Sequence, residues 1–207
     1  DKNFYKHFGV DPEGLARAAI TNFRNRSAGR RPQGASTITQ QVAKNFLVGS
    51  EQNYERKIRE ALVALKMEST YSKDKILELY LNEIYLGLGA YGVAAASLVY
   101  FDKSVNELSI AEAAYLAAMP KAPGALHPVK NHERAVERRN YVIDRLLENG
   151  WIKQADADKA RKEPLIVTNR SAGAHIFAGE YFAEEVRRDI SERYGEKKLY
   201  EGGLSVR

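Results

Sequence analysis

One carboxylate and two cations are spaced so that a helix would bring them together. Arg56, Lys57 and Glu60 fall within about 100° of one another on a helical projection. A carboxylate held beside two fixed cations can bind a phosphate or take part in acid–base catalysis. The same spacing fits an exposed salt-bridge face, which is common on helices. Spacing alone favours this second interpretation. The opposite face carries the apolar residues that we expect to point inward, Ile58, Leu62 and Leu65.

A second polar group, rich in hydroxyls and amides, lies at the start of a predicted helix. It runs from residue 33 to residue 41, and either Ser36 or Thr37 can cap the helix. The first turn of a helix offers unpaired N–H groups and the positive end of its dipole to an anion. Lys44 follows one turn after Gln41. An anion site and an ordinary capped helix start both remain open.

A polar stripe runs along a third candidate helix, which we expect to begin after Ser72 and to end near Tyr85. Lys75, Glu78, Asn82 and Tyr85 form the stripe, and the apolar remainder predicts a central, buried helix. Buried polar groups are costly unless they are paired. The stripe therefore either lines a cleft or forms an internal hydrogen-bond network.

The histidines give no sign of a metal site. His7 stands near the start of the chain, and a lone histidine is more often structural than catalytic. His127, His132 and His175 complete the set, without the spacing of metal ligands. The chain contains no cysteine, which excludes disulfides, iron–sulfur clusters and thiol nucleophiles.

The elements that position these residues are predicted to be helices. Asp11 caps a helix that begins at Pro12, and Ser109 with Glu112 forms a capping box for another. The first of these helices has an apolar face made of Leu15, Ala18, Ala19 and Phe23. Further helices are expected over residues 54–70, 90–97, 131–149 and 177–194. We predict an all-α domain over 1–165, followed over 166–207 by a connector towards a partner domain that is absent from the sequence.

The net charge of +5 is unevenly distributed. Residues 1–60 hold 11 Lys and Arg against 6 Asp and Glu, and the remainder is balanced. This predicts an anionic partner near the first 60 residues, such as a phosphate, a membrane surface or nucleic acid. The basic residues are not interleaved with aromatics and no nucleic-acid motif is present, so we expect no nucleic-acid partner. No apolar run is long enough to span a bilayer.

Several separated motifs resemble, in the same order, those of the glycosyltransferase domain of class A penicillin-binding proteins, the peptidoglycan glycosyltransferases. The pattern is closest to the bifunctional 1A type. The resemblance covers residues 1–165, and its main motifs match residues 1–9, 33–45, 56–60 and 75–87. Residues 120–123 and 138–140 also fit, and 199–206 resemble the connector into a penicillin-binding transpeptidase domain.

The resemblance implies a lysozyme-like, all-α glycosyltransferase fold with a smaller, membrane-proximal jaw subdomain. It implies polymerisation of lipid II into β-1,4-linked glycan strands by inverting transfer, in bacterial cell-wall synthesis and cell-shape maintenance. A general base must take the proton from the attacking 4-hydroxyl, and cations must neutralise the leaving lipid pyrophosphate. The alternatives are a glycan-cleaving enzyme of the lytic transglycosylase or lysozyme type, and a non-catalytic glycan- or lipid-binding scaffold.

The resemblance also assigns roles to individual residues. Glu60 matches the family's second essential carboxylate, which acts in leaving-group departure through the pyrophosphate or a divalent metal. Pyrophosphate binding is implied for Lys44, Arg56 and Lys57, and contacts with the donor or with moenomycin-type inhibitors for Ser36, Gln41 and Asn22. Support of the cleft is implied for His7, Glu78, Asn82 and Tyr85.

Two departures from the family pattern concern the base and one cation. The family's general base is the Glu immediately before the residue matching Asp1, so we expect a chain that begins at Asp1 to be inactive. Gln52 stands where the family usually has Arg, so one phosphate contact is lost or supplied by a neighbour such as Arg56.

The resemblance further implies partners and a location. Mg²⁺ or Mn²⁺ is the candidate cofactor, and whether a metal is required stays open. The expected partners are lipid II, the lipid-linked glycan strand, a membrane surface and the protein's own transpeptidase domain. The resemblance places the parent protein in the bacterial inner membrane by a single span, which this chain lacks, with its catalytic domain on the periplasmic or extracytoplasmic face.

Overall fold

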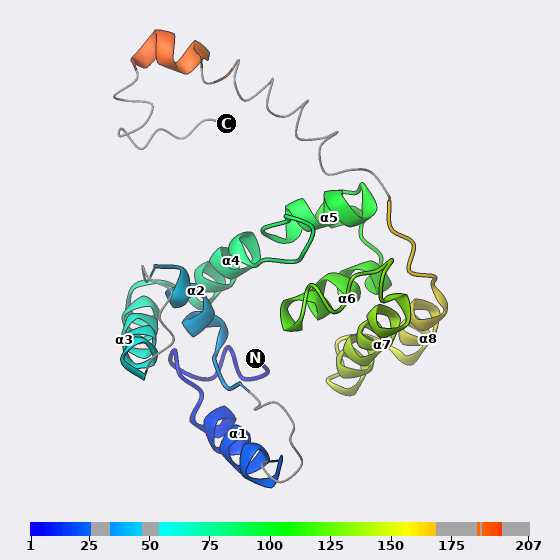
Figure 1. Cartoon of the computed structure of the whole chain (residues 1–207), viewed down its shortest axis with the longest axis horizontal. Coiled ribbons are helices and arrows are strands. Elements are labelled where there is room, and N and C mark those ends of the chain that lie inside the picture. The colour runs from blue at the N-terminus through cyan, green and yellow to red at the C-terminus, as the bar shows by residue number, and fades with distance from the viewer. Residues whose placement is uncertain (26–33, 47–53, 169–185, 187, 196–207) are drawn as a thin grey trace. The chain divides into compact units, whose positions relative to one another are not determined.

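The computed structural model describes residues 1–25, 34–46, 54–168, 186 and 188–195 (Figure 1). Every regular element in these ranges is a helix, and β-type pairing there is limited to two isolated bridges. The all-α prediction is therefore confirmed. Residues 26–33, most of the predicted connector and most of the helix expected over 177–194 lie outside the described residues. Among the described helices, none is long and apolar enough to cross a membrane.

The chain divides into two compact units, formed by residues 1–96 with 119–123 and by residues 97–118 with those from 124 onward. The first unit contains α1 (Pro12–Asn25), α2 (Ile38–Phe46), α3 (Tyr54–Thr70), α4 (Lys73–Glu83), the start of α5 (Val93–Phe101) and η3 (Met119–Lys121). The second contains the rest of α5, η2 (Val105–Glu107), α6 (Ile110–Ala118), α7 (His132–Glu148) and α8 (Gln154–Lys162). All of the predicted site residues belong to the first unit.

In the first unit, α2 packs against both α3 and α4. Val42 and Ala43 of α2 meet Ala64 and Met67 of α3 in a small buried core. Ala43 and Ala64 have no exposed surface, and their small side chains let the two helices approach closely. This packing fixes the position of α2, whose start and end both carry predicted site residues.

Three of the predicted helix caps agree with the structure. Thr37 caps α2: its hydroxyl accepts the N–H of Gln40 at 3.1 Å, and the Gln40 side chain accepts the N–H of Thr37 at 3.0 Å. Ser72 caps α4 by accepting the N–H of Lys75 at 3.2 Å. Asp11 caps α1, and its hydrogen bond from the Gly14 backbone lowers the pKa of its carboxyl group.

The inward face predicted for α3 is wrong. Ile58 and Leu62 are 63% and 61% exposed, whereas Glu60 is 3% exposed. The helix packs through Glu60, Ala64 and Met67, which lie on one face at intervals of four and three residues. The apolar stripe predicts the core face, but α2 approaches the opposite face, where a carboxylate is tolerated because cations adjoin it.

The apolar face predicted for α1 is buried only at Ala18. Phe23 is 79% exposed and Leu15 is 48% exposed, and among the residues of α1 burial is limited to Gly14 and Ala18. The contacts of α1 thus involve its small residues, while its large apolar side chains face outward.

α4 is less buried and shorter than predicted. Among its residues, Ile76 alone is buried, and the helix ends at Glu83, before Tyr85. The chain then folds back through residues 84–92, with the Gly92 N–H bonded to the Ile84 carbonyl at 2.8 Å. Gly92 has a φ of 81°, and a Cβ there would lie 2.5 Å from the Asn82 carbonyl oxygen. This loop delays the start of α5 to Val93.

The second unit is built on α6, α7 and α8. Small alanines of α6 and α8 pack around Ile143 of α7. The guanidinium group of Arg139, which is 1% exposed, donates to the backbone carbonyls of Arg161 and Glu163 at 3.1 and 2.6 Å. These carbonyls lie at the end of α8 and have no intrahelical partners, so Arg139 caps that helix.

Candidate active site

The buried Glu60 carboxylate is the centre of the first cluster. Lys57 donates to one carboxylate oxygen, and the Arg56 Nε lies 3.4 Å from the other. Lys57 also donates to the Ser36 hydroxyl at 3.1 Å. The group carries one negative and two positive charges, and the Lys57 side chain is 58% exposed. Lys57 can therefore contact an incoming anion and keep its bond to the Glu60 carboxylate.

The start of α2 adjoins this cluster and is tied to the first residues of the chain. The Ile38 N–H donates to Asp1 Oδ2 at 2.9 Å, which places a carboxylate at the positive end of the helix dipole. The Thr37 hydroxyl donates to the Gly9 carbonyl at 2.6 Å. These two bonds hold the motif over residues 1–9 against the motif over residues 33–45.

His7 contacts the same carboxylate. Its Nε2 lies 3.0 Å from Asp1 Oδ2, and because a carboxylate accepts, Nε2 is the protonated ring nitrogen. Burial lowers the pKa of His7, and the nearby Lys73 ammonium lowers it further, against the smaller opposing effects of Asp11 and Glu68. A neutral imidazole that holds Asp1 in place is a positioning group.

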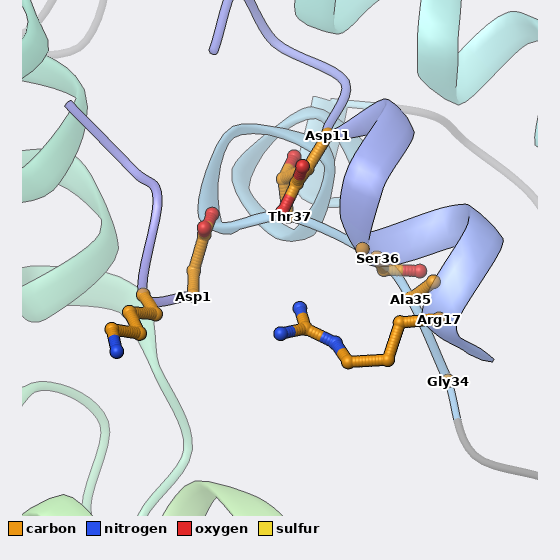
Figure 2. Close-up of a pocket in the computed structure, with 9 residues that line it drawn as sticks. Asp1, Asp11, Arg17, Gly34, Ala35, Ser36 and Thr37 are labelled. Atoms are coloured by element: carbon orange, nitrogen blue, oxygen red, sulfur yellow. The ribbon is translucent and has the colours of Figure 1, made fainter. Parts of the chain in front are cut away.

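A polar pocket of about 190 Å³ opens beside the start of α2. Figure 2 shows the Arg17 side chain extending from α1 into this pocket. The lining residues come from the chain start, α1 and the segment before α2: Asp1, Lys2, Asp11, Gly14, Arg17, Gly34, Ala35, Ser36 and Thr37. Sequence reasoning missed Arg17, because nothing in its spacing on α1 links it to residues 34–37.

Lys44 and Gln41 lie in a different pocket. This second pocket, of about 470 Å³, is lined by Gln41, Val42, Lys44, Asn45, Tyr80, Glu83, Ile84, Tyr85 and Tyr91. The prediction grouped Lys44 with Arg56 and Lys57, but Lys44 lies towards the other end of α2, beside the tyrosines. Tyr85 is thus brought to a pocket, together with Tyr91, which sequence reasoning missed.

A second buried carboxylate, Glu68, also escaped prediction. It accepts from the Thr39 hydroxyl and from the Lys73 ammonium, both at 2.6 Å, and its side chain is 3% exposed. The Lys73 nitrogen lies 4.5 Å from the centre of the Phe4 ring. Thr39 and Glu68 are 29 residues apart, so no local spacing could have joined them.

The other predicted positions lie outside these clusters. Glu78 and Asn82 are exposed on α4, and Glu78 forms an ion pair with Lys75 at 2.8 Å. Asn22 lies half-buried near the end of α1. No three His, Asp or Glu side chains of the described ranges gather at a possible metal site. Both oxygens of Glu60 already face cations, so the donor set does not fit an ion held by the protein alone.

Comparison with known proteins gives a consistent result. A family model described as Transglycosylase matches residues 1–147. Penicillin-binding protein 1A of Rickettsia bellii (strain RML369-C) is 48% identical over 207 residues, which are all of this chain and 26% of the relative. Penicillin-binding protein 1A of Aquifex aeolicus (strain VF5) is 50% identical over 206 residues, or 27% of its length.

A solved structure is also similar. The 2.6 Å crystal structure of penicillin-binding protein 1A from Haemophilus influenzae matches at 35% identity and a TM-score of 0.46. The match covers 83% of this chain and 22% of that one. This chain therefore spans about a quarter of the length of the relatives that it matches.

Proposed function

The chain belongs to the transglycosylase family, and from this premise we propose that it polymerises lipid II into β-1,4-linked glycan strands for peptidoglycan synthesis. The observation that carries the proposal is the buried Glu60 carboxylate with Lys57 and Arg56 beside it, next to the start of α2. A glycan-cleaving enzyme has no pyrophosphate to neutralise and gains nothing from such cations.

The proposed step is one displacement at an anomeric carbon. The 4-hydroxyl oxygen of the acceptor lipid II attacks the anomeric carbon of the lipid-linked strand, and a carbon–oxygen bond forms as the bond to the pyrophosphate breaks. The bonding electrons leave with the lipid pyrophosphate, and the hydroxyl proton passes to a general base. The configuration inverts, which produces the β-1,4 bond.

We propose that Lys57 and Arg56 bind the leaving pyrophosphate. At an effective dielectric constant of about 20, opposite unit charges about 4 Å apart attract by about 4 kcal/mol. Cations that are already fixed need no reorganisation as charge develops on the leaving oxygen. Glu60 acts through them, because it holds both cations in place before the substrate arrives. The Lys44 assignment remains a separate proposal, since that residue lies in the second pocket.

The general base is proposed to be the Glu that the family carries immediately before the residue matching Asp1. The Asp1 carboxylate accepts from the Ile38 N–H and from His7 Nε2, and these bonds support the assignment because they hold the side chain of the residue next to that position. His7 is then a positioning residue for the base.

A membrane surface is the proposed setting. The outward apolar side chains of α1 and α3, including Phe23, Ile58 and Leu62, support it, as does the basic balance of the first 60 residues. A lipid-linked substrate must be met at such a surface. We further propose a periplasmic or extracytoplasmic site, a transpeptidase domain in the rest of the protein, and binding of moenomycin-type inhibitors near Ser36.

Glu60→Gln, made in the protein that carries this chain, tests the proposal. We expect lipid II polymerisation to fall by about 10²- to 10³-fold, as when one electrostatic group is removed from a preorganised site. Glu55→Gln is the matched control, because Glu55 is an exposed carboxylate of the same helix, paired with Arg59. Circular dichroism checks that both variants fold.

Two results would count against the proposal. Near-normal polymerisation by Glu60→Gln would remove the role given to the cluster. Release of soluble muropeptides from purified cell wall, without polymerisation, would favour the glycan-cleaving alternative instead.

A further inference from the structure

The corner between α3 and α4 carries an ion pair that the proposed leaving-group chemistry does not use. Glu68, near the end of α3, accepts from the Lys73 ammonium at the start of α4 and from the Thr39 hydroxyl of α2, both at 2.6 Å. The Glu68 side chain is 3% exposed and the Lys73 side chain is 20% exposed. Buried ion pairs contribute little net stability, because apolar residues of similar volume often stabilise a fold as well. A pair in this setting indicates a role beyond folding stability.

Two consecutive residues of the chain start contact the first two residues of α4. The Lys73 nitrogen lies 4.5 Å from the centre of the Phe4 ring, and the Tyr5 hydroxyl donates to the Asp74 carboxylate at 3.0 Å. A cation over the face of an aromatic ring attracts it, and the attraction is stronger where water is excluded. Phe4 is 4% exposed, so this contact is largely dry. The start of α4 therefore holds the chain start at two adjacent points, and Glu68 holds the Lys73 ammonium in place.

The contacts continue from Phe4 to Asp1. The Phe4 ring meets the His7 imidazole edge to face, with 6.2 Å between the ring centres. His7 Nε2 lies 3.0 Å from Asp1 Oδ2, and the same carboxylate oxygen accepts the Ile38 N–H. A displacement of the Lys73 ammonium would therefore reach Asp1 through two packed rings.

We propose that Glu68 and Lys73 are positioning residues for the general base. Glu68 fixes the Lys73 ammonium, and Lys73 fixes the Phe4 ring. This ring fixes the imidazole that holds Asp1, the residue next to the proposed base. The inference rests on the proposed function and adds to it two residues that act through others. A misplacement of about 1 Å in a reacting group can cost on the order of 10²-fold in rate, so a distant support can still govern the reaction.

The charges around His7 provide independent support. The carboxylates of Asp1, Asp11 and Glu68 face its imidazole, together with the Lys73 ammonium and the amino group of Asp1. Burial lowers the pKa of His7, and Lys73 lowers it further, whereas Asp11 and Glu68 raise it. The Nδ1 atom is buried and has no hydrogen-bond partner in the described part of the chain, so a proton there would meet no acceptor. Loss of the Lys73 cation should favour the charged imidazolium, and loss of the Glu68 carboxylate should favour the neutral ring.

Single and double variants test the proposal in the protein that carries this chain. Lys73→Met should lower kcat for lipid II polymerisation by about 10- to 100-fold, with KM changed by less than about threefold. Lys73→Arg should recover most of the rate, because a guanidinium group can pair with Glu68 and cover the Phe4 ring. The double variant Glu68→Gln/Lys73→Met leaves no unpaired buried charge. Its urea midpoint should therefore exceed that of Lys73→Met, while its kcat stays low.

The pH profile supplies a readout that a purely structural role would not move. The acid limb of kcat/KM reports the groups of the free enzyme that must lose a proton. It should shift to higher pH in Lys73→Met and to lower pH in Glu68→Gln, because the two changes bias His7 in opposite directions. Lys103→Met is the matched control, because Lys103 pairs with Glu112 at 2.7 Å in the second unit. It should change neither kcat nor the acid limb.

Three outcomes would overturn the inference. The first is a kcat of Lys73→Met within about threefold of the parent value. The second is a double variant that recovers the parent's kcat together with its stability, which would leave the pair a role in folding alone. The third is a pair of acid limbs that shift in the same direction or not at all. If Glu60→Gln abolishes polymerisation in the same preparations, any of these refutes the positioning role alone, whereas normal polymerisation by Glu60→Gln refutes the proposed function itself.

Discussion

The Thr37 hydroxyl has two structural roles at once, and its removal should be costly. It accepts the Gln40 N–H at 3.1 Å and donates to the Gly9 carbonyl at 2.6 Å, and the residue is 2% exposed. Loss of an N-cap costs about 1 kcal/mol of unfolding free energy. A buried carbonyl left without its donor costs a further 1 to 3 kcal/mol or so. Thr37→Val, which keeps the shape, should therefore destabilise the fold by about 2 to 4 kcal/mol.

Thr37→Ser separates the hydroxyl from the methyl group. Serine keeps both hydrogen bonds and loses one buried methyl, so its cost should be about 1 kcal/mol. Urea denaturation followed by far-UV circular dichroism measures both variants against the parent. Hydrogen exchange of the α2 amides should show the greatest loss of protection in Thr37→Val.

Equal stability of the valine and serine variants would refute the reasoning, as would a valine variant within about 0.5 kcal/mol of the parent. Ser36 precedes this cap and Asp1 contacts the next residue, so the valine variant should also polymerise lipid II more slowly. The serine variant should retain most of its rate.

Two further predictions concern the backbone and the pH dependence. Gly92→Ala should destabilise the fold by about 2 kcal/mol or more, because its Cβ would lie 2.5 Å from the Asn82 carbonyl oxygen. Gly89 has a similar positive φ, but a Cβ there would meet open space. Urea denaturation should therefore show that Gly89→Ala lowers the unfolding free energy by only about 1 kcal/mol. The hydrogen bond from the Gly14 backbone lowers the pKa of the Asp11 carboxyl group in the folded state. The ionised carboxylate therefore stabilises the fold above the unfolded pKa of about 4, and this stabilisation is lost as the pH falls through the folded pKa. Asp11→Asn should cap equally well at pH 7, and its thermal midpoint should fall less on acidification; an identical pH profile would contradict this.

Local signals in the sequence identified three helix caps correctly. Thr37, Ser72 and Asp11 cap their helices through contacts with residues three positions away, and such contacts depend on short spacings alone. The clustering of Lys57 with Glu60 is local in the same way. Spacing could not decide, however, between a surface ion pair and a buried site.

Tertiary packing decided the rest. The apolar stripe of α3 predicts its core face, yet α2 packs on the opposite face beside Ala64. Lys44 shares its helix with the cap at Thr37 but lines a pocket with Tyr85 and Tyr91, which no helical projection of α2 contains. Glu68 pairs with Thr39 across 29 residues. Each of these three arrangements depends on which helices pack against one another, and short-range sequence patterns do not predict that packing.

The apolar side chains on the outward face of α3 do not hold this helix in the fold. Ile58 and Leu62 gain little from folding, because more than half of each residue stays exposed. Contiguous apolar surface of this kind promotes aggregation in plain buffer. Purification in detergent or with phospholipid vesicles should therefore improve the yield of monodisperse protein while leaving its denaturation midpoint nearly unchanged. The residues that govern the behaviour of this protein during purification therefore contribute little to its folding stability.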